Sequence, residues 1–312
     1  MSASWVHAVG LASDMAIMSL LALSAYLLLL VGRVSFGQQA FFGLGAYASG
    51  VMSALFAWPL AAALALGVVV GALCSWALAL PTMRLSGLHY AVATLAFGEM
   101  ARIALSALHW QRPTEDGPVG PAGIEGFRDI RWLLENDVSA EAYLLLTLGL
   151  LAAVLGLLMA AERTRLGTAW RMTGQDDVLT AAQGVSVARM RLLVAALAGG
   201  LAALGGGLYA HRTTYIEPAL FDPMLGVHAV GYALLGGLGT ALGPFLGVVI
   251  DLGLLDAARL FPGWRMVIFG GLVALFLRWR PRGLLDEVLV HRLGQWLRRQ
   301  PPAQPPNPPT AP

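Results

Sequence analysis

Long apolar runs separated by short polar stretches make up most of this chain. A helix needs about 20 apolar residues to cross the hydrocarbon core of a bilayer, and most of the runs approach or reach that length. The pattern predicts an all-α fold, a polytopic transmembrane helix bundle of about nine spans. The predicted spans lie near residues 8–31, 37–57, 60–80, 88–109, 142–161, 191–211, 225–238, 241–258 and 263–279.

Two stretches depart from a regular span. The seventh run is too short to cross upright, so we expect a broken or re-entrant segment there. Residues 32–50 are rich in glycine and include Ser35, Gln38 and Gln39. Irregular backbone at membrane depth needs cover from protein or water, and Gly-interrupted segments point to a transport site. The polar side chains favour an aqueous path, whereas a close-packing face is the alternative explanation of the glycines.

The stretch 163–191 is polar and lies between apolar runs. It carries five arginines: Arg163, Arg165, Arg171, Arg189 and Arg191. Within it, residues 175–183 are good helix formers with Asp176 and Asp177 near the start, and Gly184 is expected to end the helix. A short surface helix of this kind suits the docking of a soluble partner. A plain solvated connection between two spans is the alternative.

The arginines also predict an orientation. Arg33, Arg84, the 163–191 cluster and the group Arg278, Arg280 and Arg282 fall on one side of a nine-span bundle. Basic loops stay in the cytoplasm, so the N-terminus is expected outside and the C-terminus inside. The 111–141 loop, with 3 arginines against 7 acidic residues, is then external. The first 30 residues carry no basic residue, unlike a signal peptide, so the first run is expected to remain a span.

Composition narrows the class of protein. The chain of 312 residues is 57% hydrophobic and 12% charged, whereas soluble domains carry about 25% charged residues. It has no lysine, which excludes a P-loop, and its one cysteine, Cys74, excludes an intramolecular disulfide. A net charge of +2 gives no reason to expect nucleic acid binding. We therefore expect a membrane domain over 1–299 that is not an enzyme and holds no cofactor or metal, followed by a disordered proline-rich tail, 300–312.

Charged side chains inside a span are costly and point to a role. Glu99 and Arg102 lie three residues apart in the fourth predicted span, so they can pair on one helix face. We expect an ion pair buried in the bundle, with solute binding by Glu99 as the alternative. The candidate translocation path is Ser35, Gln38, Gln39 and Glu99. Three further polar residues, His89, His228 and Asp251, are either path groups or structural residues.

Six segments together resemble the LivM-type permease family of branched-chain amino acid ABC importers. They are Gly32 to Tyr47, Leu85 to Glu99, Gly120 to Ile124, Asp176 to Gly184, Leu234 to Pro244 and Pro281 to Leu284. The resemblance covers nearly the whole chain up to the tail. Gln38 stands where the family commonly has histidine, and Gly174 where it usually has a basic residue.

The resemblance implies a permease subunit that moves branched-chain or related amino acids into the cytoplasm across the bacterial inner membrane. It implies four kinds of partner: a second, LivH-like permease, two ABC ATPase subunits that bind the ATP, an extracytoplasmic substrate-binding protein, and the lipid bilayer. The ATPase-docking residues would be Arg171, Asp176, Asp177, Ala181, Ala182 and Gly184.

Three alternatives to this function stay open. Related permeases carry urea, amides or another small solute. An ion-coupled secondary transporter would need acidic residues at mid-membrane, where only Glu99 qualifies. A structural scaffold is the third alternative.

Overall fold

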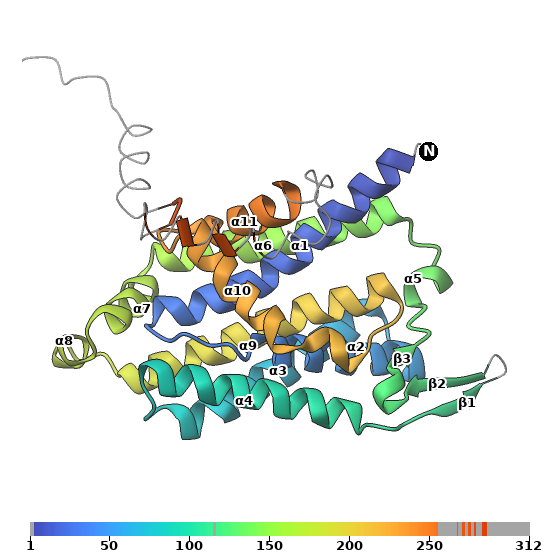
Figure 1. Ribbon diagram of the computed structural model, residues 1–312, viewed down its shortest axis with the longest axis horizontal. Coiled ribbons are helices and arrows are strands. Elements are labelled where there is room, and N and C mark those ends of the chain that lie inside the picture. The colour runs from blue at the N-terminus through green and yellow to red at the C-terminus, as the bar shows by residue number, and fades with distance from the viewer. Residues whose placement is uncertain are drawn as a thin grey trace, which may run out of the picture.

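The computed structural model describes residues 3–114 and 117–254, and beyond them residues 267, 270–271, 274–275, 278 and 283–285. Long helices run side by side along the molecule (Figure 1). Five are long and apolar enough to cross a membrane within the described residues: α1 (Ala3–Leu30), α2 (Gln38–Phe56), α3 (Leu60–Thr82), α6 (Ala140–Glu162) and α9 (Val187–Thr213). A sixth long helix, α4 (Gly87–Ser106), runs beside them.

The first six predicted spans therefore correspond to helices whose ends differ from the prediction by a few residues. The next two runs form shorter helices, α10 (Pro223–Gly236) and α11 (Leu242–Val248), the latter continued by a π-helical turn, Val249–Leu254. The ninth predicted span, 263–279, lies outside the described residues except for single positions, and so does the tail. The count of nine spans stays a prediction.

Helix α9 lies at the centre of the bundle against α1, α2 and α3. Small residues make this close approach possible. A Cβ on Gly206 would lie 1.8 Å from the carbonyl oxygen of Phe42, and one on Gly45 would lie 2.2 Å from the carbonyl oxygen of Ala203. Backbones that approach this closely gain van der Waals contact, which is the main attraction between helices in lipid.

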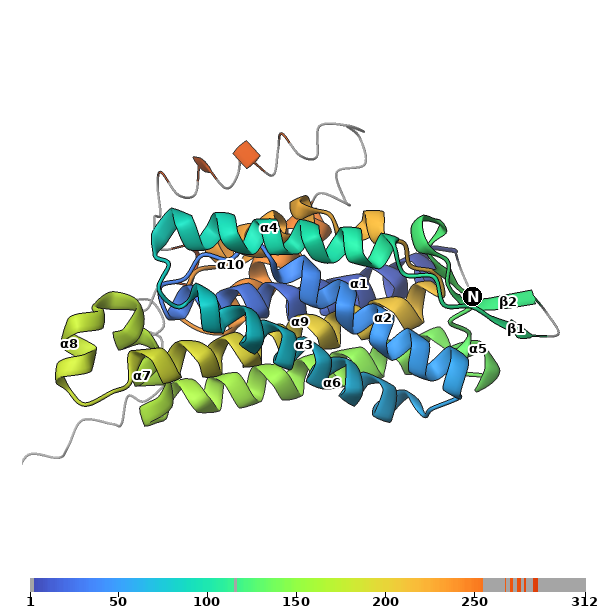
Figure 2. The same ribbon diagram turned by 90° about the horizontal axis from the view of Figure 1, so that it is seen from below.

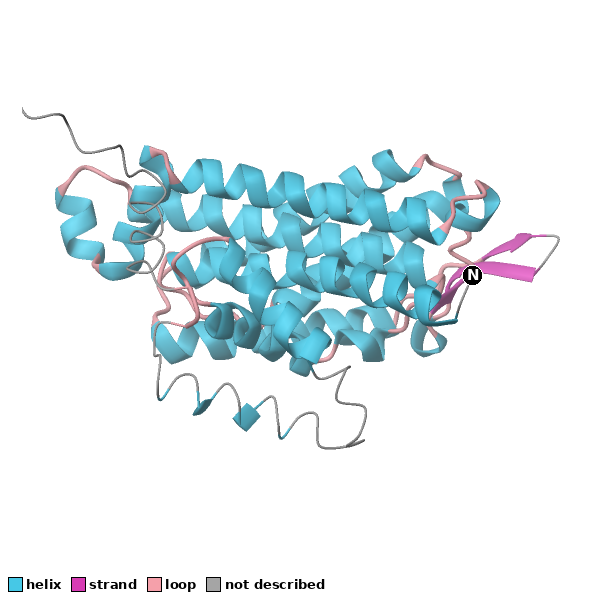
Figure 3. Ribbon diagram, turned by 90° about the horizontal axis from the view of Figure 1, so that it is seen from above, coloured by secondary structure: helices cyan, strands magenta, loops and turns pink. Residues whose placement is uncertain are grey.

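One end of the bundle carries a small antiparallel sheet that the all-α prediction missed (Figure 3). Its strands are β1 (Arg112–Thr114), β2 (Gly117–Pro121) and β3 (Phe127–Arg128), in the order β1-β2-β3, and the short helix α5 (Trp132–Glu135) follows. Such short strands give no alternating pattern to read from a sequence. Phe127 also pairs with Ile216, so the segment that follows α9 reaches this sheet end. Trp5 Nε1 donates to Glu141 Oε1 at 2.9 Å, which places the start of α1 beside the start of α6 at the same end.

The opposite end carries α7 (Arg165–Gln175) and α8 (Asp177–Ala182), which stand out from the bundle (Figure 2). The backbone N–H of Leu285 donates to the carbonyl of Gly236 at 2.9 Å, and Arg33 Nη2 donates to the carbonyl of Met83 at 3.0 Å. Arg171 donates to the carbonyls of Leu238 and Gly239, and Gly174 lies against Leu30, so the α1–α2, α3–α4 and α6–α9 connections lie at one end with residues 283–285. The arginines of the described loops, Arg33, Arg84 and those of 163–191, therefore share one end of the molecule, as the sequence predicts, whereas Arg280 and Arg282 lie outside the described residues.

The seventh predicted span forms one short, uninterrupted helix, so its expected break or re-entrance stays a prediction. From Ile216 at the sheet end, a 3₁₀ turn, Pro218–Phe221, leads into α10, which ends at Gly236 near α7. The 14 residues of α10 rise about 21 Å, less than the ~30 Å of a hydrocarbon core. Helix α2 also begins inside the bundle, because residues 33–37, which lead into it, are not helical. Two helices thus start within the bundle rather than at its ends.

Candidate functional site

The start of α2 is fixed by its packing on the middle of α4. Gly37 precedes the helix without a side-chain cap, and a Cβ there would lie 2.5 Å from the carbonyl oxygen of Thr94. The backbone N–H of Phe36 donates to Thr94 Oγ1 at 3.2 Å. A small residue is therefore needed at position 37 for the first turn of α2 to lie against α4.

Three polar side chains gather at this helix start: Ser35, Gln38 and Gln39, here called the amide cluster. Gln38 Nε2 donates to Ser35 Oγ at 3.3 Å, and both glutamines are fully buried. Gln38 Oε1 and both amide atoms of Gln39 have no hydrogen-bond partner among the described residues. Each such buried, unpaired group costs about 1–3 kcal/mol, so this cluster is an unusual feature of the interior.

Gln39 is enclosed by glycines from two other helices. A Cβ on Gly98 of α4 would lie 2.3 Å from Gln39 Nε2, and a Cβ on Gly226 of α10 would lie 2.1 Å from Gln39 Oε1. Any larger residue at either position would therefore collide with the amide. The cluster is closed between α2, α4 and α10.

Glu99 does not join the amide cluster. It forms the predicted pair with Arg102, whose Nε donates to Glu99 Oε2 at 2.9 Å and whose Nη2 contacts Oε1. The expected burial is wrong, because the side chains of Arg102 and Glu99 are 31% and 39% exposed. Gly98 is the residue that faces Gln39, and the next position on a helix is turned by about 100°. The ion pair therefore lies on the outer surface of α4.

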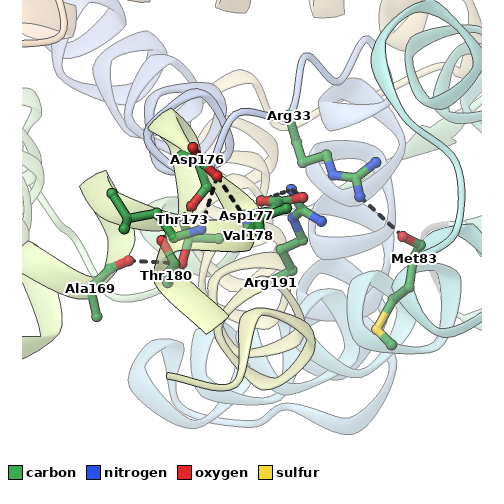
Figure 4. A network of polar contacts seen from close by, with 10 residues as sticks. Arg33, Met83, Ala169, Thr173, Asp176, Asp177, Val178, Thr180 and Arg191 are labelled. Carbon is green, nitrogen blue, oxygen red and sulfur yellow. Dashed lines mark hydrogen bonds and ion pairs between the residues drawn. The ribbon is translucent and has the colours of Figure 1, made fainter. Parts of the chain in front are cut away.

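The short helix predicted at 175–183 is present as α8. Asp176 caps it, since its Oδ1 accepts from the backbone N–H groups of Val178 and Leu179 at 2.8 and 3.0 Å. Gly184 follows with φ +81°, a conformation that favours glycine, and ends the helix as predicted. Figure 4 shows the cap and its surroundings.

An ion pair holds α8 to the base of α9. Arg191 Nη2 donates to both carboxylate oxygens of Asp177 at 2.7 Å, close to Arg33 (Figure 4). Burial, together with the positive charge of Arg191, lowers the pKa of the Arg33 guanidinium. Asp177 thus forms an ion pair within the chain, although it is also exposed on α8.

The outward face of α8 is apolar at its centre. Val178 is 80% exposed and Leu179 56% exposed. The predicted docking residues Asp176, Ala181, Ala182 and Gly184 are exposed beside them. The sequence analysis overlooked Val178 and Leu179, although an apolar pair in a polar loop is the signal that would have found them.

Arg171, in contrast, points inward and is not part of that exposed face. Its Nη1 and Nη2 donate to the carbonyls of Leu238 and Gly239 at 3.1 and 3.0 Å, and Nη2 lies 3.9 Å from Glu162 Oε2. Glu162 also accepts a hydrogen bond from the Tyr26 hydroxyl. The prediction that Arg171 lies on a docking surface is therefore wrong. Arg171 instead ties α7 to the glycine-rich turn between α10 and α11.

The structure also places polar residues that the sequence analysis did not single out. Asp14 of α1 and Arg212 of α9 form an ion pair between two spans. His211 is buried, with Nε2 2.8 Å from Ser53 Oγ. Asp14 and His211 are polar residues within predicted apolar runs, the signal that identified Glu99, and Arg212 directly follows such a run. Within the described residues, no group of three or more His, Cys, Asp or Glu side chains could hold a metal ion.

The three polar residues left open between a path and a structural role have different surroundings. Asp251 accepts from the Tyr232 hydroxyl at 2.8 Å, and His228 stacks on the Tyr232 ring. His89 is exposed on the first turn of α4. None of the three lies in the amide cluster.

Comparison with known proteins identifies the family. Residues 7–277 match the family described as the permease component of the branched-chain amino acid transport system. Two relatives are the high-affinity branched-chain amino acid transport system permease proteins LivM of Salmonella typhimurium and Escherichia coli, each 26% identical, over 279 and 276 residues. Each alignment covers 82% of this chain and 64% of the relative, so this chain spans less than two thirds of their length.

No solved structure matches the chain. The family match nevertheless extends from the first turns of α1 past the π-helical turn after α11, and so includes the amide cluster, the α7–α8 segment and the glycine-rich turn. The chain belongs to the family of permease components of branched-chain amino acid transport systems.

Proposed function

We propose that this chain is a membrane-spanning permease subunit of an ABC importer that moves branched-chain or related amino acids into the cytoplasm. Separate ATPase subunits bind and hydrolyse the ATP. The observation that carries this proposal is α8: a capped helix with exposed Val178 and Leu179, standing out from the bundle of a permease-family chain. Such a projecting apolar face suits a protein partner better than solvent.

The end of the molecule that carries α7 and α8 faces the cytoplasm in this proposal. The basic loops gathered there support it, because arginine-rich connections stay on the cytoplasmic side. The N-terminus and the small sheet then lie outside, where the substrate-binding protein docks, and the C-terminus lies inside. A LivH-like permease completes the membrane part in the bacterial inner membrane, and two ATPases complete the complex.

The solute path runs beside the amide cluster in this proposal. Ser35, Gln38 and Gln39 lie at the start of α2 inside the bundle, and the short helix α10 packs against Gln39. Helices that begin within a membrane bundle are typical of transport sites. Alternating access then requires that α2, α4 and α10 separate and close again.

Two other functions make different predictions. A related importer of urea or amides would use the same complex with another binding protein. An ion-coupled transporter would use an acidic residue at mid-membrane, but Glu99 is already paired with Arg102 on the outside of α4.

The test is reconstitution of the purified complex in vesicles with its ATPases and binding protein. We expect ATP-dependent uptake of radiolabelled L-leucine, which stops when ATP is withheld. Uptake of urea or an amide in place of leucine would show that the importer carries another solute. Leucine uptake by this chain without ATPases, driven by an ion gradient, would contradict the proposal.

A further inference from the structure

The amide cluster has hydrogen-bonding capacity that the protein itself does not use. We propose that Gln38 and Gln39 bind the polar head of the transported solute, the ammonium and carboxylate groups of an amino acid. This inference rests on the proposed function and adds which residues recognise the solute.

The unused atoms match both charges of a zwitterion. Gln38 Oε1 and Gln39 Oε1 accept hydrogen bonds, and Gln39 Nε2 donates them; none of the three has a partner among the described residues. Acceptors suit an ammonium group and the donor suits a carboxylate. Ser35 Oγ already accepts from Gln38 Nε2 and from the backbone N–H of Gly37, both at 3.3 Å, which fixes the orientation of Gln38.

The helix start adds a second reason to expect a carboxylate. No side chain caps α2, whose first turn begins at Gln38 in the interior. The N-terminus of a helix carries a partial positive charge and free N–H groups, which favour an anionic group. The neutral amides and this partial charge together suit a solute of zero net charge, because no full charge is left buried before it arrives.

The cluster is closed in this structure. Gly98 and Gly226 lie against the two amide atoms of Gln39, so a solute reaches the amide only when α4 or α10 moves away from α2. Helix α10 is bounded by a 3₁₀ turn and a glycine-rich turn, both of which interrupt the helical backbone. The opposite end of α10 is held by Arg171 through Leu238 and Gly239. Movement of α7 is thereby transmitted to the helix that covers the cluster.

A purely structural role for the glutamines predicts something different. Buried side chains that stabilise a fold are normally hydrogen-bonded, and their removal lowers stability. An unpaired buried amide costs stability, so an apolar side chain of the same shape is expected to raise it. The change in stability on replacing a glutamine by an apolar residue therefore has opposite signs for a binding role and a structural role.

The experiment uses the complete reconstituted complex, saturated with leucine-loaded binding protein, and the variant Gln39→Met, which keeps an unbranched chain of similar length. We expect leucine uptake to fall about tenfold or more. Copurification of the ATPases should be unchanged, and the melting temperature of the complex should be equal or higher. Ser49→Ala is the matched control, since Ser49 is a buried residue of α2 whose hydroxyl donates to the Gly45 carbonyl at 2.7 Å. It should transport like the wild type.

The other outcomes decide against the inference in distinguishable ways. Wild-type uptake by Gln39→Met overturns solute recognition but leaves the proposed function intact. If Gln39→Met fails to assemble, Gln38→Met decides by the same uptake measurement, and loss of assembly or a lower melting temperature in both variants assigns the glutamines a structural role. A wild-type complex that takes up no leucine refutes the proposed function, and this inference with it.

Discussion

At the scale of single residues, Arg171 connects parts of the chain that lie far apart in sequence. Its guanidinium bonds two backbone carbonyls of the turn after α10 and lies near the carboxylate of Glu162. Hydrogen bonds from a charged donor contribute about 1.5–3 kcal/mol each. We therefore expect this link to transmit a movement of α7 to the turn after α10.

Replacing Arg171 should therefore uncouple ATP hydrolysis from transport. In Arg171→Gln we expect a lower melting temperature and less leucine moved per ATP hydrolysed, because the turn after α10 loses its anchor. Arg165→Gln is the control, since Arg165 lies on the same helix but is exposed. Reconstituted vesicles give both rates. The same transport-to-ATP ratio in the two variants would refute the coupling role.

The ion pair on α4 allows a second prediction at this scale. Glu99→Gln leaves Arg102 charged and unpaired on a membrane helix, which is costly, whereas Glu99→Gln combined with Arg102→Gln removes both charges. The single variant should therefore destabilise the complex more than the double variant. Thermal melting of all members of the double-mutant cycle measures this, and additive losses would count against the pairing.

The sequence predicted this pair but not its surroundings. A spacing of three residues places Glu99 and Arg102 on one helix face whatever the fold. Which face turns inward depends on Gly98, which fits against Gln39 from another helix. The sequence analysis grouped Ser35, Gln38 and Gln39, and the structure places them together because they are near neighbours in the sequence.

At the scale of elements, α8 differs from the rest of the bundle. It is a short helix, and its strongest stabilising contacts are local: the Asp176 cap, Gly184 and the Asp177–Arg191 ion pair. These local signals explain why the sequence predicted it. Helix α7 was missed because its residues are polar and include glycines. It is stabilised instead by tertiary contacts, such as that of Gly174, where a Cβ would lie 2.2 Å from the carbonyl oxygen of Leu30. The same contact explains why no larger side chain stands at position 174.

The docking role proposed for α8 predicts the effect of a charge at the centre of that helix. Val178→Asp should abolish copurification of the ATPases while leaving the subunit folded, because a carboxylate replaces an exposed apolar contact. Ile124→Asp is the control: Ile124 is equally exposed, at 80%, but lies at the sheet end. Equal ATPase retention in the two variants would leave α8 as a plain connector.

At the scale of the whole molecule, the lengths of the apolar runs predicted the long helices, but the sequence did not predict which helices pack against one another. Helices that are apolar on every face carry no periodic signal of which side packs inward. The central place of α9 follows instead from where glycines permit close approach. At the sheet end, Phe127 of β3 pairs with Ile216, and these two residues lie far apart in the chain.

The orientation is tested by labelling in intact cells. In a Cys74→Ser background, Ile124→Cys should react with a membrane-impermeant maleimide, whereas Val178→Cys should react only after permeabilisation. Both positions are highly exposed, so accessibility alone does not favour either. The reverse pattern would invert the topology and place the basic loops outside.

The ion pair between Asp14 and Arg212 has a consequence for how the protein is made. Helix α1 leaves the ribosome before the helices that enclose it, α6, α9, α10 and α11, yet it is the most enclosed of the five candidate spans in the described residues. Until α9 emerges, Asp14 lacks its counter-ion, and an unpaired charge in a membrane helix is costly. Biogenesis therefore has to keep α1 at the insertion machinery, or shielded by a chaperone, until most of the chain has been translated. A nascent chain that stops before Arg212 is a natural substrate for membrane quality control.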